Sequence, residues 1–345
     1  MERTYGSARR VVKGMRAYLL RMPRRCVPCL PALLLGLALA IPGPAQAQGL
    51  PEFGPLNPVA SSRSGLYFHP FREPGPGRWR PAVALDYASL IEYNRLDQAD
   101  YVLDSEVLRL SFGVSRDLGR RTFLALSASV GGAYAGFLDG FLDWYHARLG
   151  FRMSERDDRP QDQFLYSIVL PDGRTVNRTR PDLFLGDVRA GLGIRLNSHL
   201  QTVFSITLPT STGPEGYGRG VPSAAILNTL KTQLSPRLIY EGSVGLGVTP
   251  THGRMADLQK TVMLAVSSGL RHRLWGNQSL YGNLFYHSPY YHDTTLPALD
   301  RRELSLDFGW TLQTQGGGEW RVGMTEDLEP GGPGVDLIFR LGRTF

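Results

Sequence analysis

Period-two alternation of apolar and polar residues recurs along most of this chain, in segments of about ten residues. From Asp187 to Leu196, one face carries apolar side chains, and the other carries charged residues and glycines. From Arg302 to Gln313, Leu, Phe and Trp alternate with Glu, Ser, Asp and Gly in the same way. This pattern predicts strands with one apolar face. No stretch after residue 47 is long and apolar enough to predict a membrane-spanning helix.

Twelve segments carry this alternation, and the connections between them alternate in length. Gaps after the even-numbered segments are short, such as Asn197-Ser198, whereas most gaps after the odd-numbered segments are longer, above all 131–182. An outer-membrane barrel combines short periplasmic turns with long outer loops, so we expect an antiparallel transmembrane β-barrel of about 12 strands, with 10 or 14 as alternatives. The expected strands lie near 79–93, 101–115, 121–130, 183–196, 199–209, 223–234, 237–249, 260–274, 278–287, 301–314, 318–327 and 334–345.

Residues 1–47 have the features of a secretory signal peptide. A cluster of arginines precedes a short apolar run at 29–41, and Ala45-Gln46-Ala47 provides a cleavage site. The sequence therefore predicts export and cleavage after Ala47. The expected organisation is a signal peptide at 1–47, an N-terminal periplasmic segment at 48–77 and an outer-membrane barrel at 78–345 with an insert at 131–182.

Charge and cysteine content narrow the function further. The chain has 38 basic and 31 acidic residues, but eight of the basic residues and one acidic residue precede residue 48, which leaves 30 of each sign. The exported part is thus neutral overall, which argues against nucleic-acid binding. Both cysteines, Cys26 and Cys29, lie in the expected signal peptide, so we expect neither a disulfide nor a cysteine nucleophile after cleavage.

The C-terminus strengthens the prediction of an outer-membrane barrel. The chain ends in Phe345, and Val335, Leu337, Phe339 and Leu341 share its face of the last expected strand. This ending resembles the terminal strand by which outer-membrane proteins are recognised for barrel assembly. We therefore expect the barrel-assembly machinery to insert this protein, with Phe345 as the signal. We also expect the protein to contact outer-membrane lipid and to be a monomer.

A series of short motifs suggests a family. Gly54-Pro55-Leu56 opens the exported part, Gly131-Gly132 and the block Gly136 to Asp143 follow the third expected strand, and Leu185-Gly186-Asp187 comes later. This order resembles the domain-of-unknown-function 3187 family of Gram-negative exported proteins, across nearly all of the exported chain. The resemblance implies an outer-membrane location. It implies no assigned activity and supplies no catalytic residues.

The 131–182 insert is predicted to contain a short helix over Phe137 to Leu149. Its aromatic residues fall near one side, and two carboxylates and a histidine share another face. Such a trio can bind a divalent cation, but three such residues at helical spacing often arise by chance, so we favour a solvated or lumen-facing polar side and expect no metal. We expect the helix to plug or constrict the barrel, with Trp144 buried. The residues in this prediction are Phe137, Asp139, Phe141, Asp143, Trp144 and His146.

Charged residues on the expected lumen face balance in sign, which favours an ion-pair network over a strongly ion-selective pore. The network is expected to include Arg109, Asp187, Arg189, Arg195, Arg237, Glu241, Glu303, Asp307, Arg321, Asp336 and Arg340.

These features favour an outer-membrane protein of unassigned activity, acting as a narrow channel or a structural envelope protein. Two alternatives remain open. The first is an outer-membrane lipid hydrolase using His287, Ser288 and Asp293, although no G-x-S-x-G motif supports it. The second is an exported soluble β-sandwich that binds a partner. No motif predicts a cofactor or a catalytic residue.

Overall fold

The computed structural model describes residues 54–345 except 76, 78, 150–159, 315–316 and 330–331. The predicted signal peptide at 1–47 lies outside the described residues. The chain divides into two compact units, and the barrel belongs to the larger one, residues 44–273 and 277–345.

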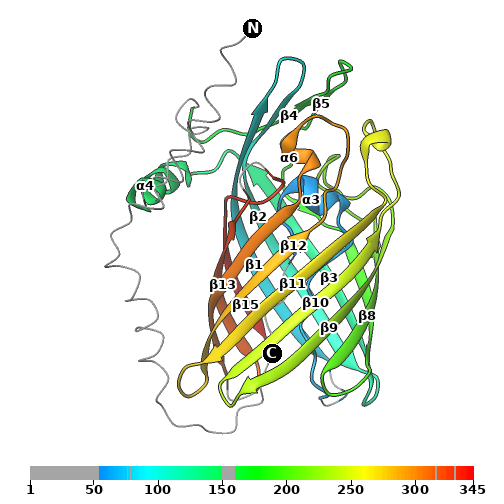
Figure 1. Ribbon diagram of the computed structural model, residues 1–345, viewed down its shortest axis with the longest axis vertical. Coiled ribbons are helices and arrows are strands. Elements are labelled where there is room, and N and C mark those ends of the chain that lie inside the picture. The colour runs from blue at the N-terminus through cyan, green and yellow to red at the C-terminus, as the bar shows by residue number, and fades with distance from the viewer. Residues whose placement is uncertain (1–53, 76, 78, 150–159, 315–316, 330–331) are drawn as a thin grey trace. The chain divides into compact units, whose positions relative to one another are not determined.

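Twelve of the 15 strands form a closed antiparallel barrel (Figure 1). Each barrel strand pairs with its neighbour along the chain, and β15 returns to pair with β1, with Leu85 opposite Leu341. The barrel strands are β1 (Arg80–Arg95), β2 (Asp100–Asp117), β3 (Thr122–Tyr134), β7 (Val188–Arg195), β8 (Leu200–Leu208), β9 (Ser223–Ser235), β10 (Leu238–Val248), β11 (Val262–Arg273), β12 (Gln278–His287), β13 (Glu303–Gln313), β14 (Glu319–Asp327) and β15 (Leu337–Thr344).

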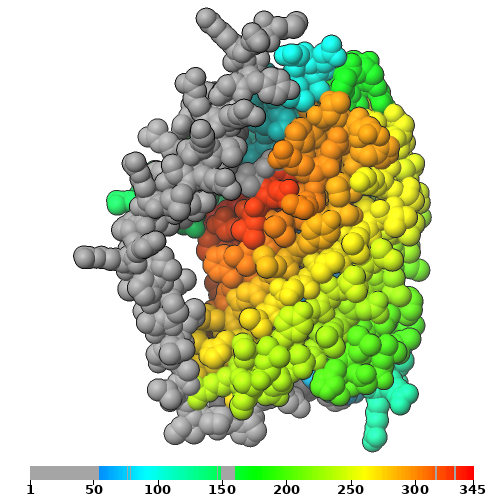
Figure 2. All heavy atoms as spheres, viewed as in Figure 1, coloured from blue at the N-terminus to red at the C-terminus, as the bar shows by residue number. Residues whose placement is uncertain are grey.

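The barrel predicted from alternation and loop length is confirmed, and all twelve expected segments contain a barrel strand. The β-sandwich alternative is wrong, because the strands of the described residues form one sheet that closes on itself. Figure 2 shows part of this closed wall, where the strands from yellow-green to orange pack side by side. Closure leaves no unpaired edge, which a sheet in a membrane requires.

The remaining elements lie in the connections and at the N-terminus. The insert between β3 and β7 contains α4 (Asp139–Leu149), the hairpin β4 (Leu165–Val169) with β5 (Thr175–Asn177), and the short β6 (Phe184–Leu185). The β4–β5 hairpin extends the sheet beyond the barrel, since β4 pairs with the first residues of β2. The other elements are α3 (Pro58–Arg63), η1 (Ala256–Leu258) and α6 (Pro297–Asp300).

The two faces of the barrel wall differ as the alternation requires. Outward-facing positions expose large apolar side chains around the wall, and we call this surface the apolar belt. The belt includes Leu85, Phe112, Val114, Leu192, Phe204, Ile206, Leu230, Val244, Leu246, Val266, Leu270, Leu284, Phe308, Val322 and Leu341.

A closed barrel with such a belt is an integral outer-membrane protein, because lipid is the solvent that such a surface matches. No helix within the described part of the chain has the length and apolar character to cross a membrane.

Candidate functional site

Charged side chains on the lumen face meet around Asp86 of β1. Arg109 Nη2 lies 3.0 Å from Asp86 Oδ2, and Arg340 Nη1 lies 3.8 Å from Asp86 Oδ1. Arg340 Nε is also 3.7 Å from Asp307 Oδ1, while Thr325 Oγ1 donates to the same Asp307 oxygen at 2.9 Å. Asp86, Asp307 and Arg340 are buried. Each charge therefore has an opposite charge or a hydrogen bond beside it, as buried charges require.

Three more ion pairs lie on the lumen face, towards the short turns. Asp117 at the end of β2 pairs with Arg80 at 2.5 Å and with Arg195 at the end of β7. Arg271 of β11 pairs with Glu319 of β14. The Asp117–Arg195 and Arg271–Glu319 pairs connect strands that are not consecutive in the sequence, so they stabilise the wall from inside.

The structure brings most of the expected lumen residues to the interior. Arg237 lies instead in the β9–β10 turn, and Asp336 precedes β15, where it is only half-buried. Asp187 lies beside a β-bulge. Ser127 pairs with Arg189 and Val130 pairs with Leu185, so the second strand has one more residue than β3 between these two pairs. The expected residues that lie on the lumen face of the strands are Arg109, Arg189, Arg195, Glu241, Glu303, Asp307, Arg321 and Arg340.

The N-terminal segment, residues 54–75, contacts lumen-facing side chains on many strands. Asn57 caps α3 by accepting from Val59 N at 2.9 Å, and its Nδ2 donates to Glu92 Oε1 of β1 at 2.5 Å. Phe71 N donates to Glu241 Oε1 of β10 at 2.5 Å. The prediction of a periplasmic segment at 48–77 is thus corrected for these residues. They lie in the lumen because their backbone groups find partners on the wall.

An arginine of α3 binds the outer rim of the wall. Arg63 is almost completely buried, and its guanidinium donates to three backbone oxygens: Pro250 O at 2.9 Å, Thr249 O at 3.1 Å and Lys260 O at 3.0 Å. Thr249 Oγ1 donates back to Arg63 O at 2.9 Å. The sequence alone does not single out Arg63 as a wall contact, although Asn57-Pro58 is a recognisable helix start that precedes it.

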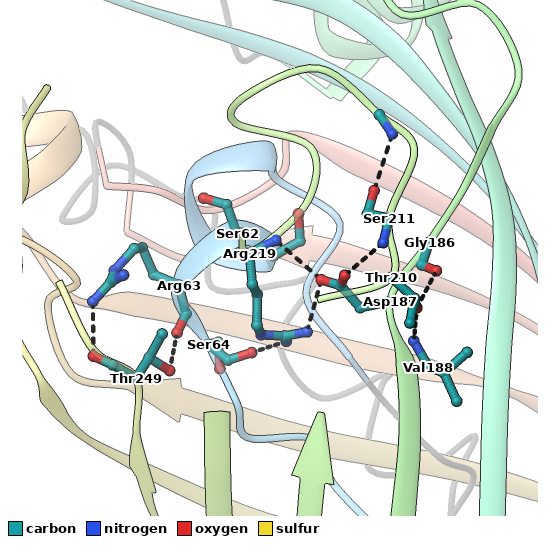
Figure 3. A network of polar contacts seen from close by, with 12 residues as sticks. Ser62, Arg63, Ser64, Gly186, Asp187, Val188, Thr210, Ser211, Arg219 and Thr249 are labelled. Atoms are coloured by element: carbon teal, nitrogen blue, oxygen red, sulfur yellow. Dashed lines mark hydrogen bonds and ion pairs between the residues drawn. The ribbon is translucent and has the colours of Figure 1, made fainter. Parts of the chain in front are cut away.

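Ser64 joins the N-terminal segment to two parts of the wall, and Figure 3 shows the part that contains Arg219 and Asp187. Arg219, in the β8–β9 loop, donates to Ser64 O, and its backbone N donates to Asp187 Oδ2 at 3.0 Å. Ser211 N donates to Asp187 Oδ1 at 3.0 Å, so one carboxylate organises this loop above the segment. On the other side, Ser64 Oγ lies 2.9 Å from His287 Nε2 of β12.

Apolar contacts complete the closure of the outer half of the lumen. Leu56, Val59, Leu66 and Phe68 of the N-terminal segment are buried in one cluster with lumen-facing strand residues and with Leu299 of α6. Burial of such side chains contributes about 1.5–3 kcal/mol each. The lower part of the segment binds mainly through polar groups, as its contacts with the wall show: Gln201 Nε2 to Pro70 O at 2.8 Å, Thr229 Oγ1 to His69 O at 3.0 Å, and Lys231 Nζ to Glu73 Oε1 at 2.8 Å.

A cavity of about 220 Å³ remains beside the N-terminal segment, and we call it the lumen cavity. Small residues of β1 to β3, such as Ala84, Gly113 and Ser127, leave this space. Arg189 lies over the ring of Tyr67, with its guanidinium carbon 3.2 Å from the ring centroid. The charged lumen-facing residues that line the cavity are Arg109, Arg189, Arg219, Arg321 and Arg340 against Asp86, Asp187 and Glu319.

The expectation that α4 plugs the barrel is wrong. Phe137, Phe141 and Trp144 expose 68%, 42% and 56% of their surface, and the Phe141 ring contacts Phe339 on the outward face of β15, 6.4 Å away. The N-terminal segment already occupies the lumen, so the aromatic residues of α4 lie outside the wall.

Polar groups of the expected α4 site also have local roles. Asp139 Oδ2 accepts from Asp162 N at 2.8 Å, and Asp143 Oδ2 accepts from Gln161 Nε2 at 2.8 Å. The side chain of His146 lies outside the described residues. Across the described part of the chain, no group of three or more His, Cys, Asp or Glu side chains is arranged to hold a metal ion.

The groups proposed for a lipid hydrolase do not come together. Ser288 Oγ accepts from Leu264 N at 2.9 Å, and the exposed Asp293 pairs with His292. His287 faces Ser64 instead, and both residues are completely buried with no exposed surface. A serine nucleophile needs access to its substrate as well as a histidine base. The Ser64–His287 contact therefore holds the N-terminal segment against the wall.

Phe345 follows directly after the last strand, which ends at Thr344. Its backbone N donates to Pro81 O at 3.0 Å, and about half of its side chain is exposed. The Arg343 guanidinium lies over the rings of both Trp320 and Phe345, at 4.6 and 4.4 Å. This cluster has the character of an aromatic girdle at a membrane interface.

Comparisons with known proteins give one family match. The model for "Protein of unknown function (DUF3187)" matches residues 55–345. A search of curated protein sequences gives no significant match.

Among solved structures, a Pseudomonas aeruginosa FadL homologue is similar at 9% identity and a TM-score of 0.40, covering 84% of this chain and 92% of that one. The CymD monoaromatic hydrocarbon channel is similar at 11% identity and a TM-score of 0.38, covering 84% and 91%. The NanC porin is similar at 7% identity and a TM-score of 0.45, covering 77% and 98%.

Proposed function

We propose that this chain, which belongs to the DUF3187 family of proteins of unknown function, is a narrow outer-membrane channel closed by its own N-terminal segment. The observation that carries this proposal is the lumen cavity. Side chains of the wall can fill a barrel of about eight strands, whereas a barrel of twelve strands encloses a wider interior. Here, small residues on β1 to β3 leave space, and a separate stretch of chain fills most of the remainder.

The closed state is held by specific contacts, so opening requires their loss. Arg63 and Arg219 bind the outer part of the N-terminal segment, while Gln201, Thr229 and Lys231 bind its lower part. Displacement of the segment would join the lumen cavity to both ends of the barrel. We infer that this displacement is the opening step of the channel.

The charges around the cavity support a preference for anions. Five arginines and three acidic residues on the lumen face line the cavity, so the passage beside the segment carries an excess of positive charge. A ring of basic side chains lowers the barrier for anions and raises it for cations. The channel would therefore pass small anionic solutes better than cations of equal size.

The location follows from the same proposal. Residues 1–47 would be removed as a signal peptide, and the barrel would be inserted by the barrel-assembly machinery and act as a monomer. N-terminal sequencing of the protein from outer membranes should begin at Gln48. A mature chain that retains residues 1–47 would contradict this part.

Planar-bilayer conductance of purified protein tests the channel directly. Arg63→Ala removes three hydrogen bonds that hold the N-terminal segment, so we expect a higher open probability than in the native chain. Arg237→Ala, in a turn away from the segment, is the matched control and should behave like the native chain. With a salt gradient across the bilayer, the reversal potential should indicate anion preference. Equal, negligible conductance in all three proteins would instead support a structural envelope protein.

An engineered disulfide that fixes the N-terminal segment to the wall makes the test more specific. A Cβ added at Gly65 would lie 3.4 Å from Ser223 Cβ of β9, close to the range that a disulfide needs. Adding Gly65→Cys and Ser223→Cys to Arg63→Ala should abolish the extra conductance under oxidising conditions and restore it on reduction. Conductance that is indifferent to reduction would show that ions do not pass where the segment lies.

A further inference from the structure

Helix α4 lies against the outward face of the barrel. The Phe141 ring is 6.4 Å from Phe339 of β15, and the Phe137 ring is 5.6 Å from Tyr87 of β1. Tyr87 and Phe339 are directly paired across the two strands, so both contacts are with one spot on the wall. Tyr145 Oη also donates to Glu326 Oε1 of β14 at 3.5 Å.

The start of α4 is fixed to the wall by a carboxylate. Glu106 Oε1, on β2, accepts from Phe137 N at 2.9 Å and from Leu138 N at 2.5 Å, and Tyr87 Oη donates to Glu106 Oε2. Gly136 precedes these groups with φ +84°, and a Cβ there would collide with the Glu106 side chain. A residue other than glycine would thus prevent this approach. The helix is therefore docked at a defined place.

The docked helix and the residue two positions before it leave an apolar stripe exposed beside the wall. Phe141 and Trp144 are three residues apart on one side of α4, Phe137 lies just before the helix, and all three are exposed. Leu142, on the opposite side, is completely buried. Arg148 continues the stripe by one turn, and its guanidinium lies 5.8 Å from the Trp144 ring. Three exposed aromatic side chains in a row are unfavourable in water.

The stripe is continuous with the apolar belt. Leu85 and Leu341 form the next outward-facing pair after Tyr87 and Phe339 on the same two strands, and both are exposed. On β2, the outward face changes from Phe112 through Leu110 and Leu108 to the acidic Glu106, so the belt ends where α4 begins. An interfacial helix in this position would place its aromatic residues at the boundary between acyl chains and headgroups.

We propose that α4 is an interfacial helix that binds the acyl chains of the outer membrane leaflet through Phe137, Phe141 and Trp144. Arg148 lies at the level of the lipid phosphates. The helix holds the long β3–β7 connection at the membrane surface beside β1 and β15. This inference is independent of the channel proposal, because it concerns only the outward face of the barrel.

Trp144 is itself the probe for this contact. A variant that retains Trp144 and replaces the other four tryptophans with Phe is reconstituted in phosphatidylcholine vesicles brominated near the top of one acyl chain. Insertion of the ring to about 5–10 Å should quench roughly half of its emission or more, relative to unbrominated vesicles. The matched control carries Thr175→Trp, on the exposed β5 hairpin, as its sole tryptophan. It should be quenched by iodide in the water and not by the lipid.

Two results would overturn the proposal. In one, Trp144 responds to iodide as strongly as the control and does not respond to brominated lipid. In the other, lipid quenching is absent, the protein is a dimer, and Trp144→Asp dissociates that dimer. This result would mean that a second copy of the chain covers the stripe. If the variant with four replacements fails to fold, as judged by heat-modifiable gel mobility, the difference in quenching between the native chain and Trp144→Phe gives the same comparison.

Discussion

Arg63 and Thr249 bind each other reciprocally: Arg63 Nη2 donates to the backbone oxygen of Thr249 at 3.1 Å, and Thr249 Oγ1 donates to the backbone oxygen of Arg63 at 2.9 Å. One partner belongs to a helix inside the barrel, and the other follows directly after β10. The pair therefore fixes the N-terminal segment to the wall at the end of the barrel where the long loops lie.

Loss of this contact should destabilise the closed state. Thr249→Val keeps the shape of the side chain and removes its hydrogen bond, which should cost about 0.5–1.5 kcal/mol. Arg63→Ala removes hydrogen bonds from a charged group and leaves three carbonyl groups without this donor, so the cost should be higher, about 1.5–3 kcal/mol or more. The temperature at which the barrel loses its heat-modifiable mobility should fall in this order. Equal temperatures for Arg63→Ala and the native chain would contradict this role.

Asp86 should be the most sensitive acidic residue of the lumen. Asp86→Ala leaves Arg109 and Arg340 without their shared partner in a buried site, and breaking such a pair typically costs about 3–5 kcal/mol. Asp172, which pairs with Arg174 in the exposed β4–β5 hairpin, offers a control, and Asp172→Ala should leave stability unchanged. Urea unfolding in detergent micelles compares the two variants. A similar loss in both would mean that burial of the lumen charges is unimportant.

If the apolar belt faces lipid, the cost of introducing an arginine on it should depend on the depth of that position in the bilayer. Val244 lies on the outward face in the middle of β10, and Val244→Arg should cost about 2–4 kcal/mol in a bilayer. Leu234 lies on the same surface beside the β9–β10 turn, and Leu234→Arg should cost about 0–1 kcal/mol, since the charge reaches the interface. Folding into lipid vesicles measures both values. If Val244→Arg folds as well as Leu234→Arg, this surface does not face lipid.

His252, in the loop between β10 and β11, should make that loop sensitive to acid. Burial lowers the pKa of His252 below its usual 6.5, with Arg63 and Arg178 acting in the same direction and Glu215 against them. The unfolded chain therefore takes up a proton at higher pH than the folded chain. Stability should fall as pH falls through about 6.5 and should level off below the folded pKa. His252→Gln should flatten this part of the pH profile of thermal unfolding, and an unchanged profile would assign the effect to other groups.

The sequence predicts the wall of this protein well because each strand is specified locally. Val188 to Arg195 alternates between lipid and lumen whatever its neighbours are, and the two-residue gap Asn197-Ser198 requires a tight turn. The N-terminal segment has no such repeat. Its place in the lumen depends on partners such as Glu241 for Phe71 and Gln201 for Arg72, which are more than a hundred residues away.

The helix α4 illustrates a different limit. Its aromatic residues predict a surface that is buried, but an apolar surface of a barrel protein can be covered either inside the lumen or by the surrounding lipid. Nothing in Phe141 or Trp144 distinguishes between them. Whether α4 lies in the lumen or in lipid depends on whether the lumen is already filled. The N-terminal segment fills it, and Asn57-Pro58 is the main feature of that segment that the sequence alone makes recognisable.

Disulfide formation within the folded protein tests most directly whether the N-terminal segment lies in the lumen. The two cysteines of the sequence, Cys26 and Cys29, lie in the predicted signal peptide, so Gly65→Cys with Ser223→Cys can be oxidised in intact outer membranes and mapped by peptide mass spectrometry. The matched pair is Gly65→Cys with Ser235→Cys, at the opposite end of the same strand β9. We predict nearly complete crosslinking of residue 65 to residue 223 and none to residue 235. Crosslinking to residue 235, or free thiols at both positions of the first pair, would place the segment in the periplasm and contradict a closed lumen.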